Sequence, residues 1–251
     1  MRTKLAVMGC MVMAGCLLIA VGAWSVEKGV ATQWHFDDGE GAYASGAGPQ
    51  TFTIDLPKTI QWVTGKQGKA VRLDGTTNGG YSGLKLNLPE GGTISLWVNP
   101  EFDSDSALAL KLSNILMLTG SAGRFELEFA YTGGDNIKPA RDFTWRCLNE
   151  GRNWTDQYGI REANSSYQKG VWQFWAATWK NLPDGRVQME LFLDGVSKGI
   201  ACIPAGRGPK GDFNLLGLSS WGWNLKGAMD ELTIYNYPLT KEEIQAALSG
   251  N

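Results

Sequence analysis

Two glutamates alternate in one stretch of the sequence, at positions 126 and 128. In an extended strand this spacing puts the side chains of Glu126 and Glu128 on the same face. Hydrolysis of a glycosidic bond needs two carboxyl groups, one to protonate the leaving oxygen and one to act as base or nucleophile. A solvated strand face shows the same alternation, so the pair is a candidate for catalysis without establishing it.

A second candidate site lies in residues 132–169, where polar and aromatic residues are concentrated. Sugar recognition requires a flat ring that stacks on the C–H face of a pyranose and fixed polar groups that bind its hydroxyls. We expect Arg152, Trp154 and Tyr158 to supply such contacts. Trp145 differs because it alternates with apolar neighbours, which is typical of a core strand.

Trp221 and Trp223 lie in a connection rich in serine and glycine, just before the final strand. They either cover the core or form an exposed stacking platform, and we include them among the candidate ligand contacts. Other catalytic signatures are missing, because the sequence has no Gly-x-Ser-x-Gly, Walker or His-Glu-x-x-His motif. Its single histidine, His35, has the phase of a surface residue, and we assign no catalytic residue.

The elements that position these residues are expected to be short strands. The 33 glycines and 11 tryptophans are many for 251 residues, and no long helical periodicity occurs. With 43% hydrophobic residues the chain can bury a sizeable core. Composition therefore favours an all-β fold, and the length is typical of one domain.

Carboxylates at the ends of the first and last strands interrupt the expected pattern. Residues 31–38 and 228–235 alternate with period two, and Asp38 and Asp230 have the phase of the core residues. A buried carboxylate needs a partner. After the last strand, Thr240 and a glutamate three residues later form a capping box, which predicts a short helix.

The same segments resemble a known family. Residues 227–244 read Gly-x-x-Asp-Glu, then Tyr-Asn, then Leu-Thr-x-Glu-Glu-Ile, similar to the C-terminal signature of laminin G-like, concanavalin A-like jelly rolls of bacterial surface and secreted proteins. Three other segments resemble the family in the same order: residues 62–75, 92–100 and 191–195. Residues 101–169 align with nothing specific. The resemblance implies an all-β, two-sheet antiparallel jelly-roll sandwich, in which the first and last strands pair, with one short C-terminal helix.

The resemblance bears on both sets of carboxylates. The family often holds a structural Ca²⁺ between its first and last strands, which implies a metal site at Asp38 and Asp230 with Asp37 as a further ligand. The alternative is that each carboxylate accepts hydrogen bonds from backbone N–H groups. Jelly-roll glucanases use a Glu-x-Asp-x-x-Glu strand, and its central Asp and final Glu are absent at Glu126 and Glu128. We therefore interpret the two glutamates as a solvated strand face.

Residues 1–23 have the layout of a secretory signal peptide. Arg2 and Lys4 precede an apolar run that ends in small residues, which predicts cleavage after Ala23. Lipidation at Cys16, as in a lipoprotein, and a retained N-terminal anchor are the alternatives. We expect a domain over residues 24–251 that is secreted, periplasmic or at the cell surface, without a stable membrane span after cleavage.

The net charge bears on the possible binding partners, and the cysteine content bears on a possible disulfide. Removing the two basic residues of the signal from the 23 Lys and Arg leaves 21, against 25 Asp and Glu, so nucleic acid is not expected. Two cysteines remain, Cys147 and Cys202, and the sequence leaves open whether they form a disulfide.

Three functions are compatible with these features. The first is a secreted or cell-surface, non-catalytic carbohydrate-binding module, lectin-like, whose partner is a glycan or cell-surface polysaccharide. The alternatives are an envelope structural or adhesion module that binds protein, and a divergent glycoside hydrolase that uses Glu126 and Glu128.

Overall fold

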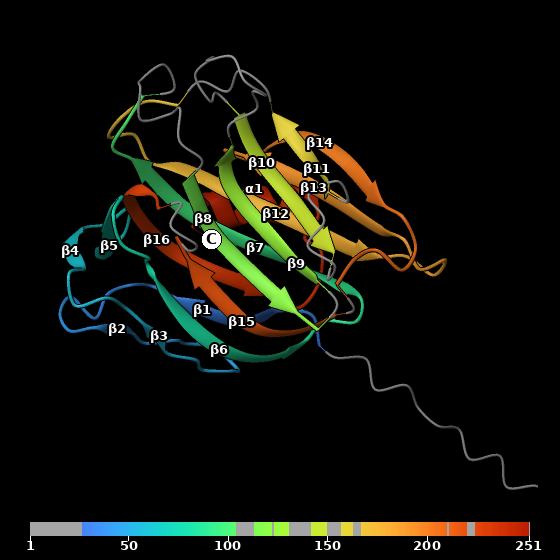
Figure 1. The fold of residues 1–251 in the computed structure, drawn as a ribbon, viewed down its shortest axis with the longest axis horizontal. Coiled ribbons are helices and arrows are strands. Elements are labelled where there is room, and N and C mark those ends of the chain that lie inside the picture. The colour runs from blue at the N-terminus through green and yellow to red at the C-terminus, as the bar shows by residue number, and fades with distance from the viewer. Residues whose placement is uncertain are drawn as a thin grey trace, which may run out of the picture.

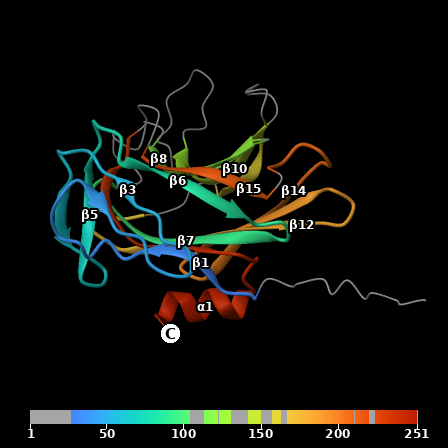
Figure 2. The same cartoon turned by 90° about the horizontal axis from the view of Figure 1, so that it is seen from below.

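Two antiparallel β-sheets stack face to face, and a C-terminal helix lies outside one of them (Figures 1 and 2). The computed structural model describes residues 27–103, 113–121, 123–130, 142–149, 157–162, 167–209, 211–219 and 224–250. The architecture confirms the predicted two-sheet sandwich with one short C-terminal helix. Within the described part of the chain, no helix has the length and apolar character needed to cross a bilayer.

The first sheet, sheet A, contains the earliest and the last strand. Its order is β14 (Val196–Ile203), β13 (Val187–Leu193), β12 (Gln173–Asn181), β7 (Gly91–Pro100), β16 (Lys226–Tyr235), β5 (Lys69–Asp74) and β4 (Gln61–Thr64), with β1 (Val30–Trp34) also paired to β16. The last strand is therefore central, between β7 and β5. The expected pairing of the first and last strands is confirmed by the register of β1 on β16.

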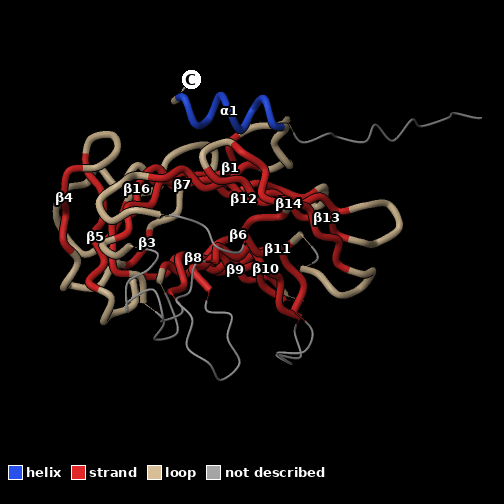
Figure 3. Tube along the Cα trace, turned by 90° about the horizontal axis from the view of Figure 1, so that it is seen from above, coloured by secondary structure: helices blue, strands red, loops and turns tan. Residues whose placement is uncertain are grey.

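The second sheet, sheet B, covers the inner face of sheet A (Figure 3). Its order is β11 (Gln157–Glu162), β10 (Asp142–Asn149), β9 (Gly123–Ala130), β8 (Ser113–Gly120), β15 (Asp212–Leu218), β6 (Gly80–Asn87), β3 (Ile54–Asp55) and β2 (Tyr43–Ala44). The late strand β15 is inserted between β8 and β6, so segments distant in sequence form the middle of the sheet.

Aromatic rings fill the space between the sheets. Phe125 of β9 stacks on Trp145 of β10 with ring centroids 4.8 Å apart, and it meets Trp179 of β12 in the opposite sheet at 5.0 Å. All three rings are buried, which confirms the predicted core position of Trp145. Because side chains alternate along a strand, the residues next to Phe125 and Leu127 project from the outer face of sheet B.

The helix α1 (Lys241–Ser249) covers a separate apolar cluster on the outer face of sheet A (Figure 2). Ile244 of the helix packs with Trp97, Phe174 and other side chains of that face. The predicted capping box is present: Oγ1 of Thr240 accepts from the backbone N–H of Glu243 at 3.2 Å, and the Glu243 carboxylate accepts from the N–H of Thr240 at 2.7 Å. The start of the helix is thus fixed locally.

Thr240→Ala removes the side-chain acceptor of the capping box. We expect the free energy of unfolding to fall by about 1 kcal/mol, measured by urea denaturation with tryptophan fluorescence. Lys241→Ala, one residue later and exposed, serves as the control and should change little. Equal midpoints for Thr240→Ala and the wild type would show that the box does not hold the helix.

Candidate functional site

Four charged residues gather on the outer face of sheet B, and we call them the charged cluster: Arg124, Glu126 and Glu128 of β9 and Arg146 of β10. They alternate with the core residues of their strands, so they project away from sheet A. The strand register places Arg146 directly opposite Glu126. Two carboxyl groups from one strand and a guanidinium from the next therefore share one small area.

Arg146 bridges the two carboxyl groups. Its Nη2 lies 2.6 Å from Oε2 of Glu126, and its Nε lies 2.8 Å from Oε1 of Glu128. Arg124 donates from Nε to Oε1 of Glu126 at 2.6 Å. Glu126 is only 2% exposed and Glu128 0%, so the prediction of a solvated strand face is wrong. Buried carboxylates need cationic or hydrogen-bonding partners, and the arginines supply them.

Burial also changes the protonation of Glu128. Desolvation raises the pKa of its carboxyl to about 8, against the opposing positive charge of Arg146 and with a further increase from nearby Glu126. Glu128 therefore keeps its proton to a higher pH than an exposed glutamate does. A carboxylic acid beside a second carboxyl group is the arrangement of a glycosidase acid and base. Here, however, the same guanidinium contacts both groups, which favours a rigid surface over a pair free to engage a substrate.

Arg124 belongs to this cluster although it was not predicted as a site residue. Its signal was present, because Arg124, Glu126 and Glu128 alternate and opposite charges on one strand face are near neighbours. The role of Arg146 depends on the cross-strand register of β10 against β9. That register pairs two strands separated in the sequence by residues 131–141, so the spacing of residues in the sequence does not predict which ones lie opposite each other.

Most of the predicted ligand contacts lie outside the described residues: Arg152, Trp154, Trp221 and Trp223. Tyr158 is placed in β11, opposite Cys147, but its side chain is not among those described. The structure therefore does not bring these five residues together or separate them, and their role stays a prediction.

The segments that carry Trp154 and Trp221 each follow a strand that is described, and these two strands end at different places on sheet B. β10 ends at Asn149, opposite Gly123, just before the segment with Trp154. β15 ends at Leu218, opposite Leu116, just before the segment with Trp221. Measured along β8, these points are Gly120, which is opposite Gly123, and Leu116, so they lie four residues apart, or about 13 Å at 3.3 Å per residue.

Asp230 is fully buried, as expected, but on the other face of its strand. Glu231 has a positive φ of 50° and the register shifts beside it, which is a β-bulge. The bulge places Asp230 opposite Trp97 on the outer face of sheet A, so the prediction that it shares a face with Leu232 is wrong. The chain between β4 and β5 buries it, and the N–H of Gln67 donates to its Oδ2 at 3.0 Å. Desolvation raises the pKa of Asp230 to about 7.

Asp37 and Asp38 follow the first strand and are exposed. The N–H of Lys69 donates to Asp37 at 2.6 Å, whereas Asp38 accepts from the N–H of Ser45 at 3.0 Å and from its hydroxyl at 2.6 Å. The inward phase predicted for Asp38 is wrong, because β1 ends at Trp34 and the positive φ of Phe36, 56°, reverses the alternation.

Each of the three carboxylates predicted to bind calcium accepts hydrogen bonds from backbone N–H groups. Asp37 and Asp230 bind backbone N–H groups of one turn, while Asp38 binds a different loop. Among the described residues, no group of three or more His, Cys, Asp or Glu side chains is placed to hold a metal ion. Calcium prefers six to eight oxygen ligands. The geometry favours the hydrogen-bonding alternative, and calcium binding stays a prediction.

The two cysteines of the domain are not bonded to each other. Cys147 is buried in the core and Cys202 is exposed on β14. Burial raises the pKa of the Cys147 thiol to about 12, so it is an unreactive core side chain.

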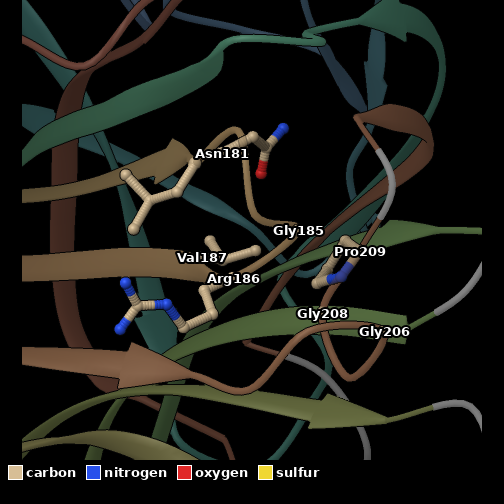
Figure 4. A pocket seen from close by; sticks show the side chains of 8 residues that line it. Asn181, Gly185, Arg186, Val187, Gly206, Gly208 and Pro209 are labelled. Carbon is tan, nitrogen blue, oxygen red and sulfur yellow. The ribbon is translucent and has the colours of Figure 1, made fainter.

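Two cavities lie away from the charged cluster. One of about 230 Å³ opens at the β12–β13 turn, beside Arg186 and Pro209 (Figure 4). Arg186 is paired there with Asp184 at 2.7 Å. The other, of about 490 Å³, is lined by Lys28, Asn236 and their neighbours. Neither lining includes an aromatic ring, so neither cavity offers a surface on which a sugar could stack.

Comparison with known proteins identifies relatives at the level of family and fold. The family model of the Concanavalin A-like lectin/glucanases superfamily matches residues 74–245. No curated protein sequence matches the chain.

Similar solved structures include domain 4 of AbnA, a GH43 extracellular arabinanase from Geobacillus stearothermophilus, in complex with arabinotriose. It is 20% identical with a TM-score of 0.58, over 88% of this chain and 98% of that one. The receptor binding domain of botulinum neurotoxin D is 14% identical with a TM-score of 0.62, over 89% of this chain and 52% of that one. The binding domain of botulinum neurotoxin DC, in complex with SialylT, is 12% identical with a TM-score of 0.59, over 89% and 51%. The chain thus spans about half of these toxin structures, and the likeness shows the fold.

The raised pKa of Glu128 makes stability depend on pH. The folded protein keeps a proton that the unfolded chain releases above the ordinary pKa of 4.5, so the stabilisation is present below that pH and is lost as pH rises toward 8. We expect the melting temperature to fall between pH 5 and pH 8, with a smaller fall in Glu128→Gln, by differential scanning calorimetry. Glu90→Gln, at an exposed glutamate, is the control. Equal slopes in Glu128→Gln and wild type would contradict the assignment.

The hydrogen bonds of Asp230 give a test of the calcium hypothesis. Asp230→Ala removes the acceptor of two backbone N–H groups and should lower stability by about 1–3 kcal/mol, equally in excess CaCl₂ and in EDTA. The wild-type melting temperature should be the same in both. A calcium-dependent rise in the wild type that disappears in Asp230→Ala would instead establish the metal site.

Proposed function

The chain belongs to the concanavalin A-like lectin/glucanases superfamily, and we propose that it is a secreted or cell-surface module that binds carbohydrate without cleaving it. The observation that carries the proposal is the outer face of sheet B, where buried ion pairs of the charged cluster hold neighbouring strands rigidly together. A rigid sheet suits recognition of a ligand on its surface, because little conformational entropy is lost on binding.

Structures of the same fold support the choice of ligand class. The structure of the arabinanase domain, of which 98% is covered by the match, was solved with arabinotriose. The botulinum neurotoxin DC domain was solved with SialylT. Such folds host many functions, so the likeness supplies a ligand class and not a particular sugar. Arg152, Trp154, Tyr158, Trp221 and Trp223 are the loop residues that we propose to add contacts.

The hydrolase alternative rests on one feature, the raised pKa of Glu128 next to Glu126. Arg146 lies within 3 Å of both carboxyl groups, and both are almost fully buried. A nucleophilic carboxylate must reach the anomeric carbon, and a general acid must reach the leaving oxygen. The shared arginine opposes both movements, which is why we place binding before hydrolysis.

A glycan array probed with the purified protein tests the proposal. We expect binding to one class of saccharide, with dissociation constants in the micromolar to millimolar range and no release of reducing ends from the bound polysaccharide. Binding to envelope protein and to no saccharide would favour the adhesion alternative. Reducing ends released by the wild type and not by Glu128→Gln would establish the hydrolase instead.

A further inference from the structure

A row of cross-strand partners crosses the outer face of sheet B beyond the charged cluster. The register pairs Tyr43 of β2 with Asp55 of β3, and Asp55 with Tyr81 of β6. Tyr81 is in turn opposite Gly217 of β15. Directly opposite residues point to the same side of a sheet, so the two tyrosines stand on either side of the aspartate. The row continues through β8 to Glu126 and Arg146.

The two tyrosines belong to the few large hydrophobic side chains that are exposed among the described residues. Tyr43 is 54% exposed and Tyr81 36%, and Asp55 between them is also exposed. Their sequence neighbours Ala44 and Ile54 are fully buried, which confirms that the row faces outward. The tyrosines are separated by one strand, so their backbones lie about 10 Å apart, twice the spacing between strands.

Gly217 lets the ring of Tyr81 lie close to the sheet. A Cβ atom at Gly217 would come within 3.2 Å of Cε1 and 3.3 Å of Cδ1 of that ring. The Tyr81 hydroxyl also accepts from Nδ2 of Asn78 at 3.2 Å. One side of the ring therefore covers the glycine, the hydroxyl is held, and the remaining surface is available for stacking. Two residues further along β6, a Cβ atom at Gly83 would have no other atom within 4 Å.

We propose that Tyr43, Asp55 and Tyr81 form a subsite for a neutral oligosaccharide that runs across the strands of sheet B. The inference rests on the proposed carbohydrate-binding function and names its site. Each ring stacks on the C–H face of a sugar unit, and the carboxylate of Asp55 accepts hydrogen bonds from neighbouring hydroxyls of the unit between them. The open space above Gly83 leaves room for the oligosaccharide beside Tyr81.

The charges of this face favour a neutral ligand over an acidic one. Asp55 is the charged residue between the two rings, and it would repel a uronic or sialic acid carboxylate. Arg124 and Arg146 are already paired with glutamates. Lys85 shares the face but lies four residues along β6 from Tyr81, about 13 Å away. A carboxylated sugar in the subsite would therefore meet the negative charge of Asp55, and the described lysine of β6 lies too far away to offset it.

Titration calorimetry with neutral hexasaccharides of glucose, xylose and arabinose, and with trigalacturonic acid, tests the subsite. Tyr43→Ala and Tyr81→Ala should each weaken binding of the neutral ligand about threefold to tenfold, since one stacking contact is lost. Tyr81→Phe should retain it. Ile200→Ala, at an exposed apolar residue of β14 in sheet A, is the matched control and should bind like the wild type.

The outcomes separate the subsite from the function. Wild-type affinity in both tyrosine-to-alanine variants, with unchanged melting temperatures, would overturn the subsite and leave carbohydrate binding intact. Tighter binding of trigalacturonic acid than of every neutral ligand would overturn the charge argument. A wild-type protein that binds no saccharide, on the array or by calorimetry, would overturn the proposed function and the subsite together.

Discussion

The packing of Phe125 against Trp145 and Trp179 fixes the register of sheet B, and the outer face of the sheet depends on it. Side chains alternate with period two, so a slip of one residue would move Glu126 into the core and Phe125 to the outer face of the sheet. Burial of three aromatic rings makes that exchange very costly. The same register sets Arg146 opposite Glu126, which allows two carboxyl groups to be buried on the outer side.

A second constraint joins the first and last strands to the turn between β4 and β5. Asp37 and Asp230 accept hydrogen bonds from backbone N–H groups of this turn, and the turn needs glycine where the carboxylates come close to its backbone. A Cβ at Gly68 would collide with the Asp37 carboxylate, and one at Gly65 would meet Oδ2 of Asp230. Two carboxylates near strand ends can therefore hold a neighbouring turn by accepting hydrogen bonds from its backbone N–H groups.

The sequence predicted what depends on long local patterns: the all-β sandwich, the pairing of its first and last strands, the core position of Trp145 and the helix cap at Thr240. It failed where one residue changes the phase, as at Phe36 and Glu231, since a positive φ at a non-glycine residue leaves no pattern. Tyr43 and Tyr81 were missed for another reason. β2 has two residues, too few for a periodicity, and only the register reveals the row.

The outer face of sheet B thus combines a rigid charged cluster with an open row of tyrosines, and our central claim is that this face binds carbohydrate. Hydrogen–deuterium exchange of the protein, with and without a saturating neutral hexasaccharide, tests the claim most directly. Slower exchange in residues 43–55 and 79–85, with no change in α1 or β14, is the expected result. Protection confined to α1 or β14, with sheet B unchanged, would contradict it.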